Sequence, residues 1–295
     1  MTAEKAARAQ TATDANSEAF EFVRELANEL SEGKVELPSF PDIAIRVQRV
    51  LADDNVTPDR VVRVLGSEPA LAANILTIAN SAAMTLNGRQ ITDLRMAISR
   101  MGFDMLRSAA ITFAMAQMRK AEQFRGLEKQ MNQLWQRSVF VAAMSFVIAK
   151  RHTKISPDTA LLSGLLHGIG KLYILTRASK HPLLFADVAA YNQILQDWHA
   201  SIAKALLENW GMADEIVEAV HGCDDPERDL RGPVLLVDVI AAAHIFVSFK
   251  DDAALLEVRL QEAKMHTRLG LDALACVAIN EDSAEEIAAL KAALG

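Results

Sequence analysis

Apolar residues recur at helical spacing in one segment after another along the chain, and no stretch shows the strict alternation of a half-buried strand. Residues 43–51, 93–101 and 104–118 are three such segments, and Gly102 separates the last two. A glycine between two periodic runs is typical of a break between helices. The sequence therefore predicts an all-α protein.

The stretch LLSGLLHGIGKL, residues 161–172, predicts the end of a buried helix followed by a tight turn. Its first four leucines, Leu161, Leu162, Leu165 and Leu166, lie on one helical face, and Ser156 followed by Pro157 is a favourable helix start. The three glycines of the stretch allow close backbone approach and a change of direction. We expect this turn to present His167, with Lys171 just beyond it.

Changes in composition divide the chain into five regions. The first residues are rich in alanine and threonine and lack apolar periodicity, so we expect them to be disordered. The polar residues 122–126 are expected to join two lobes. The predicted regions are a disordered lead-in (1–16), an N-terminal helix (17–36), an N-terminal helical lobe (37–121), a second helical lobe (122–250) and a helical tail (251–295).

Two local signals predict details of this organisation. Asn87 followed by Gly88 favours a turn between two helices of the first lobe. Ser283 and Glu286 have the spacing of a capping box, which predicts the start of the last helix of the tail.

Composition and charge exclude several classes of partner. Of the 295 residues, 51% are hydrophobic and 23% are charged, as in an ordinary globular protein. Aromatic residues make up 5%, too few to favour a base-stacking surface for single-stranded nucleic acid. The net charge of −7 provides no global field that attracts nucleic acid or an anionic membrane. We therefore expect neither nucleic acid nor membrane as a partner.

The two cysteines, Cys223 and Cys276, have no paired spacing and predict no disulfide framework. The longest apolar run that we identify, residues 234–249, is interrupted by Asp238 and His244 and is too short for a membrane span. No signal peptide is recognisable. We expect a protein of the reducing cytoplasm.

Seven separate blocks of the sequence occur in the order typical of one family. The blocks are LPSFPDIAIRVQRVLAD, GSEPALAANILTIANSA, DLRMAISRMGFDMLR, LWQRSVFVA, LLHGIGKL, DWHASIAKALLENWGM and DEIVEAV. In these blocks the chain resembles the HDOD family, bacterial HD-related output domains that are degenerate relatives of the HD and HD-GYP metal-dependent phosphohydrolases. The resemblance implies a two-lobed helical architecture with an HD-like second lobe. It also implies a role in signalling or regulation through binding, without established hydrolase activity.

The resemblance further indicates where the metal site of the HD enzymes would lie. The corresponding positions here, together with the lysine after the turn, are Arg137, His167, Gly168, Lys171, His199, Cys223, Asp224 and His244. Only His167 and His199 match the enzymes. Gly168 replaces an aspartate and has no ligating side chain, and Arg137 replaces a histidine and has no lone pair to give a metal. We therefore predict a pseudo-enzyme without catalytic residues, metal or cofactor.

Two other interpretations of the same positions remain open. Imidazole and thiolate ligands bind zinc tetrahedrally, so part of the set could hold a structural zinc, although their scattered spacing favours ordinary hydrogen-bonded residues. That set is His167, His199, Cys223 and His244. Alternatively, Arg137 and Lys171 could form a small cationic pocket for a phosphate or carboxylate.

Three functions follow from these interpretations. The first is a stand-alone regulatory module without catalysis, with a signalling protein docked in the groove between the lobes or on the first lobe. The second is a residual phosphohydrolase acting on a nucleotide or cyclic dinucleotide through a rearranged metal site. The third is a sensor that binds a nucleotide second messenger at Arg137 and Lys171 without cleaving it.

Overall fold

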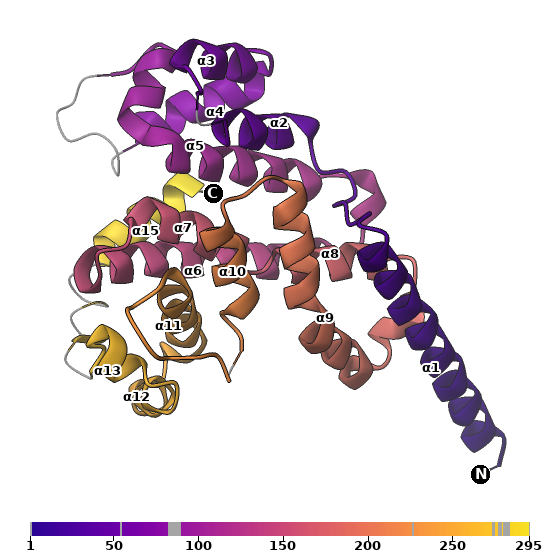
Figure 1. Ribbon diagram of the computed structural model, residues 1–295. Helices are drawn as coiled ribbons and strands as arrows, with labels where there is room; N and C mark the ends of the chain where they lie inside the picture. Colours follow the sequence, from indigo (N-terminus) through magenta and orange to yellow (C-terminus); the bar gives the residue numbers. More distant parts are fainter. Residues whose placement is uncertain are drawn as a thin grey trace.

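The computed structural model describes residues 2–53, 55–81, 90–225, 227–272, 275–276, 279 and 284–294. All regular structure in these ranges is helical, which confirms the predicted all-α class (Figure 1). The turn predicted at Asn87 and Gly88 lies outside the described residues, as does the cap predicted at Ser283.

The helices run in chain order through the two lobes and the tail. The N-terminal helix and first lobe contain α1 (Thr2–Ser31), α2 (Asp42–Leu51), α3 (Pro58–Gly66), α4 (Pro69–Ala79), α5 (Leu94–Met118) and the 3-10 turn η1 (Glu122–Phe124). The second lobe contains α6 (Glu128–His152), α7 (Pro157–Leu166), α8 (Ile169–Ala178), η2 (Pro182–Phe185), α9 (Val188–Asn209), α10 (Asp214–Gly222) and α11 (Leu236–Phe249). The tail contains α12 (Ala253–Glu262), α13 (Met265–Leu269) and α15 (Ala284–Leu294).

The expectation of a disordered lead-in over residues 1–16 is wrong for the described part of that range. Helix α1 begins at Thr2 and runs without a break to Ser31, and its N-terminal end points away from the body of the molecule (Figure 1). The prediction relied on apolar periodicity. The segment lacks it, but six of its 16 residues are alanine, the strongest helix former.

The second half of α1 is anchored to the second lobe by polar contacts. Glu29 accepts a hydrogen bond from Tyr173 and forms an ion pair with Arg177. Glu18 accepts a hydrogen bond of 3.0 Å from the backbone N–H of Leu183. This half of the helix is therefore part of the folded body rather than a free arm.

In the first lobe, side-chain caps and one glycine mark the helix boundaries. The side chain of Thr57 caps α3 ahead of Pro58, and Asp93 accepts a hydrogen bond of 2.9 Å from Met96 N at the start of α5. Gly102 breaks the helical geometry within α5, with φ of 72° and ψ of 173°. The predicted separation at this glycine is confirmed as a kink within one helix.

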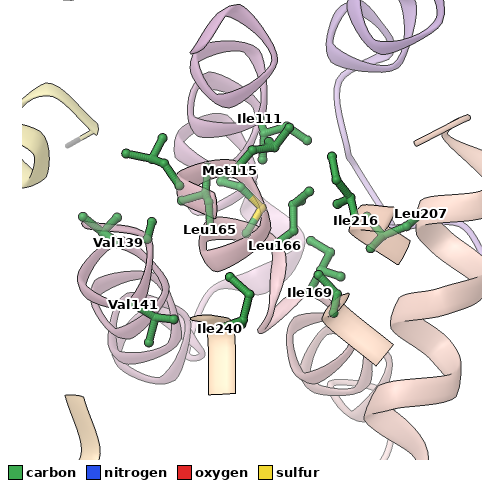
Figure 2. Close-up of a cluster of buried hydrophobic side chains, with 14 of the residues drawn as sticks. Ile111, Met115, Val139, Val141, Leu165, Leu166, Ile169, Leu207, Ile216 and Ile240 are labelled. Carbon is green, nitrogen blue, oxygen red and sulfur yellow. The ribbon is translucent and has the colours of Figure 1, made fainter. Parts of the chain in front are cut away.

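One hydrophobic core extends through both lobes. Figure 2 shows Ile111 and Met115 of α5 packed near Leu165 and Leu166 of α7. Helix α7 also lies close against α6, because a Cβ at Gly164 would be only 2.7 Å from the Cα of Ala142. The buried pair α7–α8 is therefore surrounded by the rest of the molecule.

Polar and aromatic contacts fix the lobes relative to each other. Thr159 Oγ1 of α7 donates a hydrogen bond of 2.8 Å to Asp104 Oδ2 of α5. The rings of Phe40 and Trp210 stack with their centroids 4.6 Å apart. These contacts join the connector and α5 of the first lobe to α7 and the end of α9 in the second.

One apolar stretch is longer than the sequence interpretation recognised. Residues Pro157–Ala178 are long and apolar enough for a membrane span by composition, but 89% of the apolar window is buried inside the protein. They form α7 and α8, the centre of the second lobe, so their apolar character is explained by the core.

The tail packs on the second lobe. Helices α12 and α13 contact α11, and α15 contacts α6. In Figure 1 the tail helices α12 and α13 lie beside α11, on the side away from α3 and α4.

Candidate functional site

The turn between α7 and α8 places the first residue of the candidate site. Helix α7 starts at the predicted cap, where Ser156 Oγ accepts a hydrogen bond of 3.3 Å from Thr159 N. His167 and Gly168 form the turn that follows α7. Gly170 allows α8 to lie directly on α9, because a Cβ there would be 1.9 Å from the carbonyl oxygen of His199. This close approach brings His199 to the same region as the turn.

His167 is a buried, neutral histidine. Its Nδ1–H donates a hydrogen bond of 2.7 Å to the carbonyl oxygen of Gly164. Burial, with further contributions from His244 and Lys171, lowers the pKa of His167 to about 3. Its ring lies 5.5 Å from that of His244, centroid to centroid. His167, one of the two histidines that match the enzymes, is thus uncharged at neutral pH.

Asp224 is the centre of the polar cluster. Its Oδ2 lies 3.0 Å from Lys171 Nζ and 3.4 Å from His199 Nε2, and its Oδ1 lies 3.1 Å from His244 Nδ1. Burial alone would raise the pKa of this carboxyl, but His244 and Lys171 outweigh burial and hold the pKa far below its usual value. Asp224 is therefore an anion surrounded by donors.

His244 and Arg137 extend this cluster. Arg137 Nη2 donates to His244 Nε2 at 2.8 Å and to Ser248 Oγ at 2.6 Å. Since Nε2 accepts, the Nδ1 of His244 carries the proton that it donates to Asp224. The side chains thus form a chain of contacts from Lys171 through Asp224 and His244 to Arg137, which we call the relay cluster.

His199 completes the surroundings of Asp224. Burial first, and then the charge of Lys171, lower the pKa of His199 to about 4, so the imidazole is neutral at neutral pH. The two retained histidines, His167 and His199, are therefore both uncharged beside a cluster whose carboxylate is already paired.

The position that lost its aspartate is also sterically restricted. A Cβ at Gly168 would lie 2.9 Å from Ser138 Oγ, which is closer than such atoms normally approach. Ser138 is itself buried. A carboxylate-bearing side chain at residue 168 would require Ser138 to move.

The zinc interpretation receives no geometric support in the part of the chain that the structure describes. No group of three or more histidine, cysteine, aspartate or glutamate side chains there has metal-binding geometry. Cys223 is buried and donates its S–H to Val220 O at 3.3 Å, and burial followed by the charge of Asp224 raises the pKa of its thiol far above the usual value. A protonated thiol is a poor zinc ligand.

A cavity of about 530 Å³ opens beside the relay cluster. Its wall includes Lys171, Gln196, His199, Asp224, Arg228 and His244. Arg137 is not part of this wall, and it lies at the other end of the relay cluster from Lys171. The two cations expected to form one pocket are thus separated by Asp224 and His244.

Sequence reasoning missed three participants. Ser248 lies four residues after His244 on α11, so helical spacing could have indicated that both share a face. Gln196 and Arg228 line the cavity from α9 and from the loop after α10, and no local signal marks them.

The comparisons with known proteins agree with this architecture. The sequence profile of the HDOD domain matches residues 37–226, well over half of the chain. The chain belongs to the HDOD family. The matched range includes Arg137, His167, Lys171 and Asp224 and ends before His244. The predicted resemblance is therefore confirmed.

Solved structures share the fold over nearly the whole chain. A candidate metal-dependent phosphohydrolase from Shewanella amazonensis SB2B is 26% identical, with 95% of this chain and 100% of that chain covered and a TM-score of 0.75. An HDOD domain protein of unknown function from Geobacter sulfurreducens is 25% identical, with coverage of 92% and 96% and a TM-score of 0.63.

A curated relative of unassigned function occurs in Treponema pallidum. It is 20% identical over 243 residues, which cover 77% of this chain and 45% of the relative. The HDOD protein described here thus spans less than half the length of that relative.

Proposed function

We propose that this HDOD protein is a non-catalytic regulatory module of bacterial signal transduction, which acts in the cytoplasm by binding a protein partner or a small ligand. Family membership supports a signalling role. The relay cluster is the observation that supports a function without catalysis. Both oxygens of Asp224 and both nitrogens of His244 already have partners within the protein.

The charges of the relay cluster oppose metal binding. An HD hydrolase uses one or two divalent cations to activate water and to neutralise phosphate. Here Lys171 and Arg137 put a fixed positive charge at each end of the cluster, and the carboxylate between them is the one acid in it. A divalent cation would have to displace Lys171 from Asp224 and would meet repulsion from both side chains.

A protein partner is favoured by the way the lobes are joined. A hollow of about 630 Å³ lies where the connector after α1, helix α2 and the end of α9 meet, and Glu36, Asp42, Arg46 and Arg49 are among its wall residues. Because the stacked pair Phe40 and Trp210 fixes this junction, the two lobes present one preformed surface to a partner.

Small-ligand binding at the degenerate site is the second candidate. It is favoured by the cavity beside the relay cluster, whose size of about 530 Å³ lies in the range of small-molecule sites. Lys171 and Arg228 are the cations of its wall, and Lys171 would bind an anionic ligand at the cost of its contact with Asp224. A nucleotide second messenger fits this chemistry.

A phosphate-release assay on the purified protein tests the proposal. With manganese or iron supplied, we expect no turnover of cyclic dinucleotides, guanosine polyphosphates or a chromogenic phosphoester, while an active HD phosphohydrolase assayed in parallel turns over. Reproducible turnover that disappears in His167→Ala would contradict the proposal and would establish the residual phosphohydrolase instead.

A ligand screen separates the two kinds of binding. Thermal stabilisation by a nucleotide that is lost in Lys171→Gln, but retained in Lys250→Gln, would assign the ligand to the degenerate site. Stabilisation that persists in Lys171→Gln would place the nucleotide elsewhere and count against the second candidate.

A further inference from the structure

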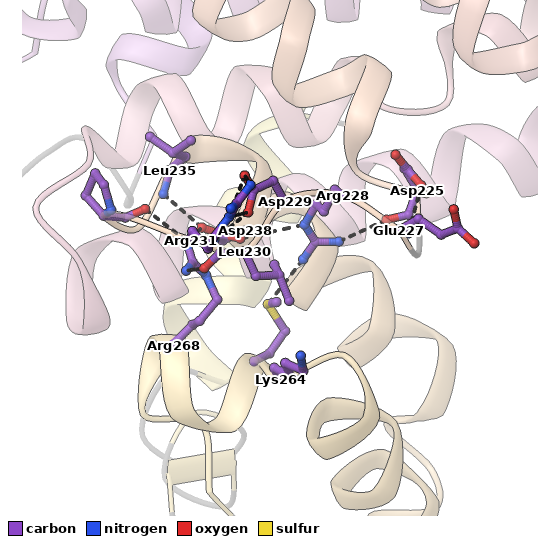
Figure 3. A network of polar contacts seen from close by, with 12 residues as sticks. Asp225, Glu227, Arg228, Asp229, Leu230, Arg231, Leu235, Asp238, Lys264 and Arg268 are labelled. Carbon is purple, nitrogen blue, oxygen red and sulfur yellow. Dashed lines mark hydrogen bonds and ion pairs between the residues drawn. The ribbon is translucent and has the colours of Figure 1, made fainter.

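A second and larger cavity adjoins the cavity beside the relay cluster, and the two share Arg228, Ile245 and Ala263 in their walls. It has a volume of about 980 Å³ and lies between the loop of residues 227–231, helix α11 and the tail helices α12 and α13. All of its wall residues come after the last residue matched by the HDOD profile. We call it the tail cavity, and Figure 3 shows most of its charged residues.

Most cations of the tail cavity are neutralised by neighbouring acids. The pairs are Arg231 with Asp229 at 2.7 Å, Arg259 with Glu262 at 2.8 Å and Arg268 with Asp238 at 2.6 Å. Arg268 also donates to the carbonyl oxygens of Leu230 and Pro233. Arg268 therefore joins α13 to the loop and to α11, whereas the pairs of Arg231 and Arg259 are exposed contacts within one loop and one helix.

Arg228 is different, because all of its contacts are long. Its Nη1 lies 3.4 Å from Asp225 O, its Nη2 3.6 Å from Met265 Sδ and its Nε 3.7 Å from Asp238 Oδ1. Arg268 is much closer to Asp238 and takes up that carboxylate. The side chain of Arg228 is only 14% exposed, and its guanidinium makes no short hydrogen bond (Figure 3).

Lys264 is the second loosely held cation of the tail cavity. Its ammonium group has no hydrogen-bond or ion-pair partner among the residues that the structure describes. Its backbone is left-handed, with φ of 58°, between α12 and α13. A left-handed lysine is strained, and such strain is characteristic of functional sites.

The remaining wall residues determine the kind of ligand. Glu227 is the acid of the wall without an ion-pair partner among the described residues, and it extends away from Arg228 and Lys264 in Figure 3. Ile245 and Phe249 of α11 provide an apolar side, and the guanidinium of Arg259 lies over the Phe249 ring, 5.6 Å from its centroid. The tail cavity therefore combines two available cations with an apolar surface.

We propose that the tail cavity binds a small organic phosphate, with the phosphate group held by Arg228 and Lys264 and the apolar part of the molecule against Ile245 and Phe249. A guanidinium and an ammonium group are the standard protein donors to phosphate oxygens. The cavity size agrees with a small-molecule site. Arg228 and Ile245 also line the cavity beside the relay cluster, whereas Lys264 and Phe249 line the tail cavity alone. The proposal does not depend on the proposed function.

Calorimetric titration of the full-length protein with phenyl phosphate tests the proposal. Inorganic phosphate serves as the probe without an apolar part, and benzyl alcohol as the probe without charge. We expect saturable binding of phenyl phosphate, weaker binding of inorganic phosphate and no binding of benzyl alcohol. Absence of heat from phenyl phosphate at millimolar concentration would overturn the proposal.

Variants locate the ligand. Lys264→Asn removes the charge and keeps a residue that tolerates the left-handed backbone, so it should weaken phenyl phosphate binding about tenfold without unfolding the protein. Arg228→Lys, which keeps the charge but loses the planar pair of donors, should also weaken it. Lys250→Gln, outside the cavity wall, should bind as the wild type does.

Two results would refute this location. One is unchanged affinity in Lys264→Asn. The other is an affinity that falls only in Lys171→Gln, which would place the ligand in the cavity beside the relay cluster. Circular dichroism on each variant shows that any loss is not a loss of fold.

Discussion

The relay cluster and the tail cavity both contain basic residues next to a hollow, but they differ in how those residues are satisfied. In the relay cluster, Lys171 and Arg137 have contacts of 3.0 Å or shorter to Asp224 and His244. In the tail cavity, Arg228 has only long contacts and Lys264 has none among the described residues. A basic side chain beside a cavity is therefore more available to a ligand where no protein group already pairs with it.

This difference has an energetic consequence. Charges that are paired and partly buried contribute to the folded state, and removing one partner leaves the other uncompensated. Charges that are held without partners contribute little to folding and are available for binding. The relay cluster should therefore respond to mutation through stability, and the tail cavity through ligand affinity.

The largest expected effect is that of Asp224→Asn. It leaves Lys171 without its counter-ion and places an amide NH2 donor against a lysine or histidine donor, so the free energy of unfolding should fall by about 3 kcal/mol. Urea denaturation measures this change. Asp229→Asn, in the exposed pair with Arg231, is the matched control and should leave the midpoint unchanged. Equal losses of stability in the two variants would show that ion pairs in the relay cluster and in the tail cavity contribute alike to folding.

Gly170→Ala tests the packing that supports the relay cluster. The added Cβ would lie 1.9 Å from His199 O and would force α8 away from α9, so we expect a loss of about 2–3 kcal/mol. Gly66→Ala is the control, since nothing lies within 4 Å of the Cβ and an alanine is preferred over glycine in a helix. A tolerated alanine at residue 170 would mean that the close approach is not required.

The pH dependence of stability should report the buried histidines. His167 and His199 have a folded-state pKa of about 3 and about 4, against 6.5 when unfolded, so the unfolded state binds more protons at acidic pH. Their stability contribution is complete above pH 6.5 and is lost as the pH falls toward 4 and then 3.

For His199 the loss should be about 3 kcal/mol between neutral pH and pH 4, and urea denaturation at each pH measures it. His199→Gln, which cannot take up a proton, should show a shallower decline. A variant with the same pH profile as the wild type would argue against a buried neutral imidazole.

The smallest expected effect has the opposite sign. Lys264→Gly relieves the left-handed backbone and removes a charge without a partner, so stability should rise by about 1 kcal/mol while phenyl phosphate binding weakens. Thermal unfolding and calorimetry on the same sample check both. A destabilised variant would mean that Lys264 contributes to folding, as the paired cations of the relay cluster do.

Local sequence signals were sufficient for most of the fold. The helix start at Ser156, the break at Gly102 and the helix–turn–helix around His167 depend on residues a few positions apart. The wrong prediction for residues 1–16 also came from local sequence. We looked there for a periodic apolar face, whereas the helix forms on residue propensity without one.

The candidate site was predicted as a list of positions but not as a cluster. The pairing of Lys171 with Asp224 joins residues 53 apart in sequence, and that of Arg137 with His244 joins residues 107 apart. Whether a cation has a partner is a property of tertiary packing. For the same reason no pattern indicated Arg228 or Lys264, whose importance lies in the contacts that they lack.

Titration of manganese into the apoprotein at neutral pH, followed by calorimetry, tests the central claim most directly. If Lys171 and Arg137 neutralise the centre of the degenerate site, the wild type will show no saturable uptake at submillimolar metal. Stoichiometric uptake that disappears in His199→Ala would show instead that the site still holds a metal, and it would contradict the account.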